Sequence, residues 1–344
     1  MKKFLLNAFA AALCCMVSAA TMLAWKIAKG QKAAETAFAL PPGTEALHIG
    51  NSHTGYTFVQ DPKFRNKVIY TPGAPFQTAA VSLLELDRLG YLDGVKLCTM
   101  DCDIATMLCS ASYKILYRHW RDTMAYSMDN IRLFPMHPVT LWIHAATMIG
   151  WPTAFGGPYA TGLGQVAKER WDKKSQQAKE QDLNRVSPRG GHGEVVPLHI
   201  DSAQKEALLS SVRAVKEVCD RREIVLFLFA GPLAKDHPGR KRPELYRDCS
   251  EIVSEIRAMG VAYADFSASC PDSMFMNSDH LHEEGAEKFT EAFFDAMAKL
   301  VPRKKQDGKD GEVWRDGNIE FGNAVQSYIG RRMLQENAGA GGGD

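Results

Sequence analysis

A nearly continuous apolar run at residues 224–230 lies between two segments with helical periodicity. A strand that is apolar on both faces is typical of the middle of a parallel sheet, where helices cover both sides. The preceding helix is predicted to start at a capping box of Asp201 and Gln204, and the following one to end at Gly260. Their apolar faces are expected to carry Leu208, Val212, Val215 and Cys219 in the first helix, and Leu245, Cys249, Ile252, Ile256 and Met259 in the second.

The same alternation of strand and helix patterns extends over most of the chain. Strands alternating with helices indicate a parallel sheet covered on both faces, and right-handed crossovers place the loops that follow the strands along one edge. The expected fold class is therefore α/β, with a three-layer doubly wound parallel sheet, a helical insertion and an N-terminal hydrophobic helix. We expect strands at 46–49, 67–70, 95–100, 224–230 and 261–266, and further helices at 77–89 and 286–300.

Composition divides the chain into regions. Residues 31–43 form a linker that ends at a Pro-Pro-Gly turn, and residues 44–302 form the main domain. Residues 110–200 interrupt the strand–helix rhythm with aromatic and then polar segments, so they are interpreted as an insertion. Residues 303–344 are polar and glycine-rich, and we expect them to lie outside the core, partly disordered, with one weak helix at 321–334.

The first 30 residues carry a targeting signal. Two lysines precede a nearly charge-free stretch at 4–25, which is about long enough to cross a bilayer. An uncleaved signal anchor, a signal peptide cleaved near Ser18-Ala19-Ala20, and a lipid anchor at Cys14-Cys15 are the three interpretations. We expect residues 4–25 to contact the membrane, with the main domain anchored on its extracytoplasmic side.

Charge and cysteine usage exclude other classes of protein. The chain has 41 basic and 40 acidic residues, and this net charge of +1 gives no footprint for nucleic acid. No CxxC pair indicates zinc, and Cys98, Cys219 and Cys249 fall on apolar faces, where cysteine acts as a small hydrophobe. The segment Asp279-His280-Leu281-His282 has metal-ligand residue types but no third ligand at a diagnostic spacing. We therefore expect neither a metal nor another cofactor.

Two turns, more than 220 residues apart, carry residues suited to catalysis. Gly50-Asn51-Ser52-His53 follows the first predicted strand, and Asn277-Ser278-Asp279-His280 precedes the last helix of the main domain. An α/β fold brings such strand-to-helix turns to the same edge of the sheet. Ser52 and His280 are therefore a candidate nucleophile and base.

These turns, together with Gly73 after the second strand and the pattern His-Leu-x-x-x-Gly at 280–285, resemble the SGNH (GDSL-type) hydrolase superfamily. The resemblance covers roughly residues 44–110 and 200–300 and implies a flavodoxin-like fold. It implies that Ser52 is the nucleophile and His280 the general base, since Gly285 fits the spacing from His280 and not from His282. The N–H groups of Ser52 and Gly73 would form the oxyanion hole.

Similar membrane-anchored members are O-acetyl esterases and acyltransferases of cell-surface polysaccharides. The resemblance thus implies a serine esterase or O-acyltransferase whose partner is an acylated carbohydrate or a small ester. Two positions depart from the family pattern: Asn277 stands where the triad acid is expected, and Asp103 where the third oxyanion donor, an Asn, is expected. Asp279 and Asp272 are alternative carboxylates for the histidine. A non-catalytic glycan-binding or scaffold protein with the same fold is the alternative function.

Overall fold

The computed structural model describes residues 39–70, 76–103, 202–237, 243–300 and 313–340, with a few isolated positions near the N-terminus. The predicted insertion at 110–200, the turn containing Gly73, the capping residue Asp201 and most of residues 4–25 lie outside these ranges. No helix among the described residues combines the length and apolar character needed to span a membrane. Membrane anchoring by residues 4–25 therefore stays a prediction.

A five-stranded parallel sheet forms the centre of the protein, so the expected α/β class is confirmed. The strand order is β2-β1-β3-β4-β5, and each strand lies where its apolar run predicted it, with differences only at the ends. The chain leaves β1 toward β2 and later returns to the other side of β1 to form β3. This reversal creates a switch point at the carboxyl ends of β1 and β3, where ligands bind in such sheets. The strands are β1 (Ala46–Gly50), β2 (Asn66–Tyr70), β3 (Leu97–Asp101), β4 (Val225–Ala230) and β5 (Ala262–Asp265).

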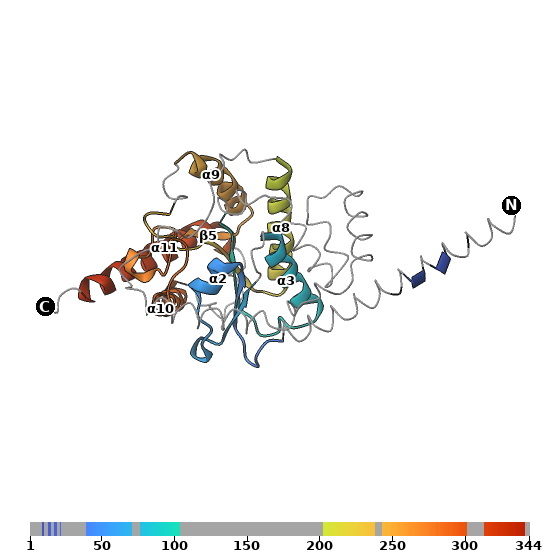
Figure 1. Ribbon diagram of the computed structural model, residues 1–344, viewed down its shortest axis with the longest axis horizontal. Coiled ribbons are helices and arrows are strands. Elements are labelled where there is room, and N and C mark those ends of the chain that lie inside the picture. Colours follow the sequence, from blue (N-terminus) through green and yellow to red (C-terminus); the bar gives the residue numbers. More distant parts are fainter. Residues whose placement is uncertain are drawn as a thin grey trace.

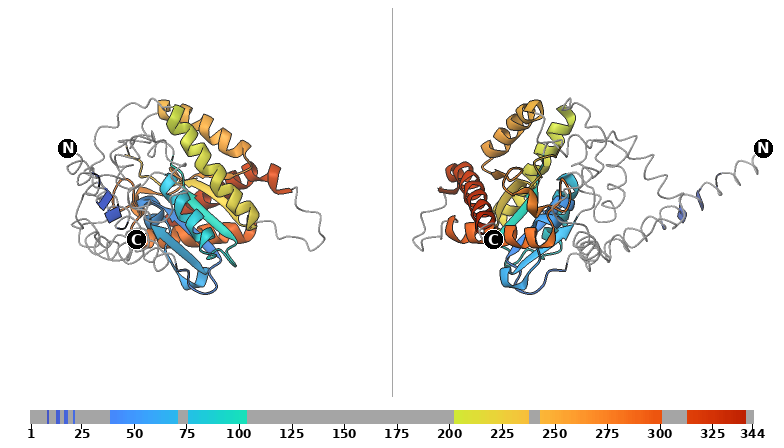
Figure 2. Two further views of the ribbon diagram at one scale, coloured as in Figure 1. Left: turned by 90° about the vertical axis from the view of Figure 1, so that its right-hand side faces the viewer. Right: turned by 60° about the vertical axis from the view of Figure 1, so that its left-hand side comes forward.

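Helices cover both faces of the sheet, with α3, α8 and α9 on one side and α2, α10 and α11 on the other (Figure 1). Figure 2 shows α8 and α9 running alongside each other over their face. The helices predicted from apolar periodicity are present at the expected places. Their bounds are α2 (Ser52–Thr57), α3 (Phe76–Arg88), α8 (Ser202–Arg221), α9 (Pro243–Ala258), α10 (Glu283–Leu300) and α11 (Val313–Ala340), with 3-10 turns η1 (Pro62–Phe64) and η4 (Asp272–Met274).

The alternation of side chains along each strand produces two hydrophobic clusters, one on each face. In β4, Leu226 and Leu228 pack with α3, α8 and α9, whereas Phe227 and Phe229 pack with α10 and α11. Because both faces of β4 are buried, its sequence is apolar without interruption, as the sequence pattern indicated. Cys98 and Cys219 are buried in the first cluster, and Cys249 packs against it. All three are free thiols, which confirms their interpretation as small hydrophobes.

Helix α11 corrects the expectation that the segment after residue 303 lies outside the core. Phe321, Val325, Ile329 and Met333 repeat every four residues and are all buried in the second cluster. The helix packs against the edge strand β5 and against α10. A Cβ atom at Gly322 would lie 2.3 Å from the backbone oxygen of Tyr263, so only glycine permits this close approach. The apolar stripe was overlooked because polar and glycine residues surround it.

Candidate active site

The turn after β1 places Ser52 and His53 at the switch point of the sheet. A Cβ atom at Gly50 would lie 2.1 Å from Thr54 Oγ1 and 2.9 Å from Asp101 Cβ, so glycine allows α2 to begin directly after the strand. Asn51 is the N-cap of α2, and its Oδ1 accepts the His53 backbone N–H at 2.8 Å. Ser52 is consequently the first residue of the helix.

The end of β3 contributes two buried carboxyl groups, those of Asp101 and Asp103. The backbone N–H of Asp103 donates to Asp101 Oδ1 at 3.1 Å. Burial, and then the charge of Asp103, raise the pKa of Asp101 well above its usual range. Both carboxyl groups face the same ring nitrogen: His53 Nδ1 lies 3.8 Å from Asp101 Oδ2 and 4.0 Å from Asp103 Oδ2.

The loop before α10 brings Asp279 and His280 to the site. An antiparallel bridge between Phe275 and Leu281 closes this loop, and the Asp279 backbone N–H donates to Asn277 Oδ1 at 3.1 Å. Gly285 has a structural reason in this fold. A Cβ atom at that position would lie 2.5 Å from the backbone oxygen of Met274, so glycine lets the first turn of α10 pack against η4.

His280 and His282 have different surroundings. His280 Nδ1 lies 3.1 Å from Asp279 Oδ1 and 3.1 Å from Asn277 Nδ2. Both nitrogens of His282 are already used: Nε2 donates to the Ser273 backbone oxygen at 2.8 Å, and Nδ1 accepts the Gly285 N–H at 3.0 Å. Of the two histidines, His280 is therefore the one with a nitrogen available for chemistry.

Asp279 is also the carboxylate that reaches His280, whereas Asp272 serves a different group. Asp272 Oδ1 accepts the backbone N–H of Lys235 at 2.8 Å, and the described part of the chain records no bond from it to His280. Asn277, at the position where the resemblance predicts an acid, reaches the same nitrogen of His280 with its amide.

Asn277 and Asp279 favour opposite tautomers of His280. Because Asn277 Oδ1 accepts from the Asp279 backbone, its Nδ2 group faces Nδ1 and can only donate to it. That arrangement requires a lone pair on Nδ1. The Asp279 carboxylate, when ionised, can only accept, and so requires a proton on Nδ1. A general base acting through Nε2 needs the tautomer that Asp279 favours.

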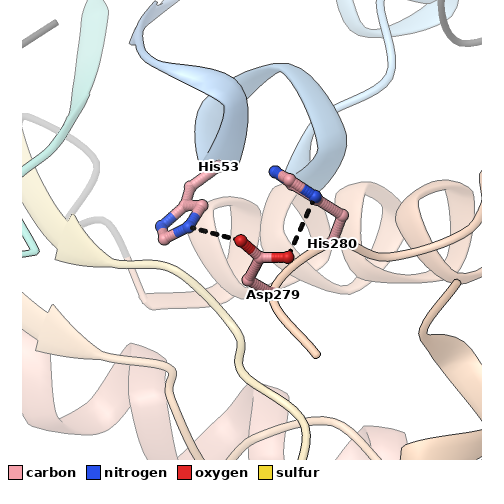
Figure 3. Close-up of side chains that lie close together, drawn as sticks. All are labelled: His53, Asp279 and His280. Atoms are coloured by element: carbon pink, nitrogen blue, oxygen red, sulfur yellow. Dashed lines mark ion pairs between the residues drawn. The ribbon is translucent and has the colours of Figure 1, made fainter. Parts of the chain in front are cut away.

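His53 belongs to the site although no role was predicted for it from the sequence. It lies between carboxyl groups, with Asp101 and Asp103 near Nδ1 and Asp279 Oδ2 4.0 Å from Nε2 (Figure 3). Only 5% of its side chain is exposed. Burial, followed by the charge of His280, lowers the pKa of His53 to about 4 although Asp103 and Asp279 act in the opposite direction. His53 is therefore neutral near pH 7. The signal in the sequence was only its position directly after Ser52.

Ser52 lies on the side of α2 that faces His280. Residues four apart share a face of a helix, and the ring of Tyr56, four residues after Ser52, lies 4.4 Å from the His280 ring between centroids. Ser52 and His280 are not hydrogen-bonded to each other, since His280 Nε2 is buried and has no hydrogen-bond partner among the described residues. Gly73 lies outside the described ranges, and Asp103 is turned toward His53.

Comparison of the chain with protein-family models, with curated proteins and with solved structures gives no match. Among the described residues, this is an α/β protein whose parallel sheet brings Ser52, His53, His280 and the buried aspartates Asp101, Asp103 and Asp279 to its switch point.

Proposed function

We propose that the protein is a serine hydrolase of the SGNH (GDSL-type) kind, an esterase or O-acyltransferase that acts on ester groups, O-acetyl above all, of surface carbohydrate. The observation that carries the proposal is the position of His280 beside α2, with Asp279 Oδ1 3.1 Å from its Nδ1. A nucleophile, a base and a carboxylate that orients the base are the three parts of a serine triad. The strand order of the sheet is also that of flavodoxin-like folds.

In the proposed reaction, His280 Nε2 removes the proton from Ser52 Oγ, which attacks the carbonyl carbon of the ester. Asp279 holds the proton on Nδ1 and stabilises the imidazolium that forms. The alcohol leaves with the proton from Nε2, and the acyl group on Ser52 then passes to water or to a sugar hydroxyl. The step needs a hydrogen bond between Ser52 Oγ and His280 Nε2, and such catalytic hydrogen bonds often tighten only in the substrate complex.

The oxyanion hole is proposed to consist of the N–H groups of Ser52 and Gly73. Asp103 does not add a third donor, because an ionised carboxylate only accepts hydrogen bonds. Its Oδ2 lies 4.0 Å from His53 Nδ1, which indicates that it serves the histidine instead. With two donors in place of three, we expect slow turnover. Removal of one such donor typically costs on the order of 10²–10³ in kcat.

Residues 4–25 are proposed to anchor the protein in a membrane, with the sheet domain on the extracytoplasmic side. This location would bring the site to surface carbohydrate, which fits the substrate class inferred from the resemblance.

Hydrolysis of p-nitrophenyl acetate by the wild type and by Ser52→Ala tests the proposal. Ser254→Ala is a matched control, because this serine lies on the exposed side of α9 and bonds only within its own helix. We expect Ser52→Ala to lose activity to the background rate and Ser254→Ala to retain it. Equal rates for wild type and Ser52→Ala would contradict the proposal.

A non-catalytic glycan-binding protein is the second candidate. Asn277 favours it, because its amide donates to His280 Nδ1 and thereby disfavours the tautomer that a base requires. This candidate predicts binding of acetylated oligosaccharides by a protein that hydrolyses none of them, and it predicts that Asn277→Asp does not create activity.

A further inference from the structure

Two histidines and one carboxylate converge beside the proposed catalytic serine. Ligand atoms of His53, Asp279 and His280 all lie within 4.8 Å of one another, and all three residues are buried. Figure 3 shows the Asp279 carboxylate between the two imidazole rings, which come from α2 and from the loop before α10. The separations recorded between the carboxylate and the two rings are 3.1 Å and 4.0 Å.

These separations suit a tetrahedral metal ion. Ligands at about 2.0–2.1 Å from a tetrahedral Zn²⁺ lie about 3.3 Å from one another, so the three groups need only small side-chain movements to share an ion. Two imidazoles with one carboxylate are a ligand set that divalent transition metals accept, and three protein ligands leave a fourth position for water.

The surroundings of His53 are those of a metal ligand. Histidines that bind metals usually direct their other ring nitrogen at a carboxylate, which fixes the ring and its tautomer. His53 Nδ1 faces the carboxyl groups of Asp101 and Asp103, and its Nε2 faces Asp279. His53 Nδ1 and Asp101 Oδ2 are both buried, are 3.8 Å apart and have no hydrogen-bond partner among the described residues.

The histidine nearest to the cluster in the sequence, His282, does not belong to it. His282 has both nitrogens bonded to the backbone and is unavailable as a ligand. The third ligand, His53, comes from α2. The spacing of residues within 279–282 alone therefore does not predict a metal site. His280 has a second buried nitrogen, Nε2, without a partner among the residues described.

We propose that His53, Asp279 and His280 bind one divalent transition-metal ion of the Zn²⁺ class, and that this ion switches off the serine chemistry. Binding follows from the cluster alone. Inhibition rests on the proposed function, because His280 and Asp279 are there the base and its orienting carboxylate. The nitrogen of His280 beside Asp279 is Nδ1, and a neutral imidazole that binds a metal through Nδ1 carries its proton on Nε2. Nε2 then no longer accepts a proton from Ser52, so the site holds either the ion or an active base.

The binding test uses the full chain without a histidine tag. Co²⁺ is added as a spectroscopic probe, and Zn²⁺ affinity is measured by calorimetry. We expect one ion per chain with the intense visible absorption of four-coordinate Co²⁺, and a loss of affinity of at least about 100-fold in His53→Gln and Asp279→Asn. His282→Gln is the matched control and should bind as the wild type does. Equal affinity of wild type and His53→Gln would overturn the proposal.

A second measurement guards against variants that fail to fold. Diethylpyrocarbonate modification of the wild type is followed by mass spectrometry with and without Zn²⁺. Zn²⁺ should lower the modification of His280 and leave the modification of histidines outside the cluster unchanged. Uniform reactivity with and without Zn²⁺ would overturn the metal site.

Ester hydrolysis in the same samples separates this proposal from the proposed function. Zn²⁺ should lower Ser52-dependent hydrolysis in the wild type by at least tenfold at saturation, and His53→Gln should resist it. Metal binding that depends on His53, without any ester hydrolysis, would support the metal site and overturn the esterase. Hydrolysis that depends on Ser52, in a protein without metal affinity, would support the esterase and overturn the metal site. A rise in hydrolysis with Zn²⁺ would overturn the inhibitory role.

Discussion

Asp279 Oδ1 lies 3.1 Å from His280 Nδ1, although the two residues are adjacent in the chain. The Asx turn at Asn277 and the bridge between Phe275 and Leu281 fold the loop so that neighbouring side chains face each other. In the proposed mechanism, Asp279 therefore takes the place of the triad acid, at a distance from His280 suited to hydrogen bonding.

Replacing that carboxylate should weaken the base. We expect Asp279→Asn to lower kcat for ester hydrolysis by about 10³–10⁴ with little change in KM, since loss of the orienting carboxylate favours the wrong tautomer of the imidazole. The matched control is Asp272→Asn, whose carboxylate accepts a backbone N–H at Lys235. Steady-state kinetics check both variants. An equal loss in the two variants would indicate a general structural effect.

Asn277→Asp should strengthen the base, in contrast to Asp279→Asn. The substitution removes an N–H donor 3.1 Å from His280 Nδ1 and puts an acceptor in its place, while the new carboxylate can still accept from the Asp279 backbone. We expect kcat to rise about tenfold, which corresponds to about 1.4 kcal/mol of transition-state stabilisation. A fall in kcat in a folded Asn277→Asp protein would mean that the amide has a positive role.

Two glycines in α11 test the packing of that helix. A Cβ atom at Gly322 would lie 2.3 Å from the Tyr263 oxygen, whereas one at Gly330 would meet nothing within 4 Å. We expect Gly322→Ala to lower the free energy of unfolding by about 1–3 kcal/mol, as overpacking does. Gly330→Ala should raise it by about 0.5–1 kcal/mol, because alanine is the better helix former. Urea unfolding measures both, and equal effects would contradict the docking of α11.

Acid should destabilise the protein through His48. This histidine is fully buried in β1, its Nδ1 lies 2.7 Å from Thr99 Oγ1, and its ring stacks on Phe58. Burial lowers the pKa of His48 from 6.5 to about 3. Between these values the unfolded chain binds a proton that the folded chain does not, so stability is full above pH 6.5 and falls as the pH drops below it.

The size of this effect can be measured. The lowered pKa of His48 should contribute about 1.4 kcal/mol to the stability lost between pH 7.5 and 5.5. We expect His48→Gln, although less stable at pH 7.5, to lose about that much less over the same interval. Urea midpoints at the two pH values provide the comparison, and identical losses would show that another group controls the acid response.

The sequence predicted the sheet well because its signals are local. Buried parallel strands such as 224–230 are apolar throughout, and amphipathic helices repeat their apolar residues every three or four positions. Helix α11 was underestimated because, between residues 320 and 335, where burial is described, its buried hydrophobic side chains are only Phe321, Val325, Ile329 and Met333. Whether such a stripe is buried depends on the edge of β5 and the surface of α10, which a local pattern does not contain.

The candidate site was predicted only in part, because only some of its residues stand in local sequence motifs. Ser52 and His280 stand in motifs whose spacing can be read along the chain, and Asp279 was one of two candidate carboxylates. The role of His53 arises only from proximity to Asp101, Asp103 and Asp279, which come from two other segments. Whether Asp272 or Asp279 reaches His280 depends on hydrogen bonds within the loops, such as the one that the Lys235 backbone N–H donates to Asp272. No sequence pattern encodes these bonds.

The most direct test of the catalytic proposal is fluorophosphonate labelling followed by peptide mass spectrometry. The reagent reacts with a serine only when a neighbouring base activates it. We predict one adduct per chain, on Ser52, and its loss in His280→Ala. No adduct on Ser52 in the folded, metal-free wild type, or equal labelling of Ser52 in His280→Ala, would contradict it.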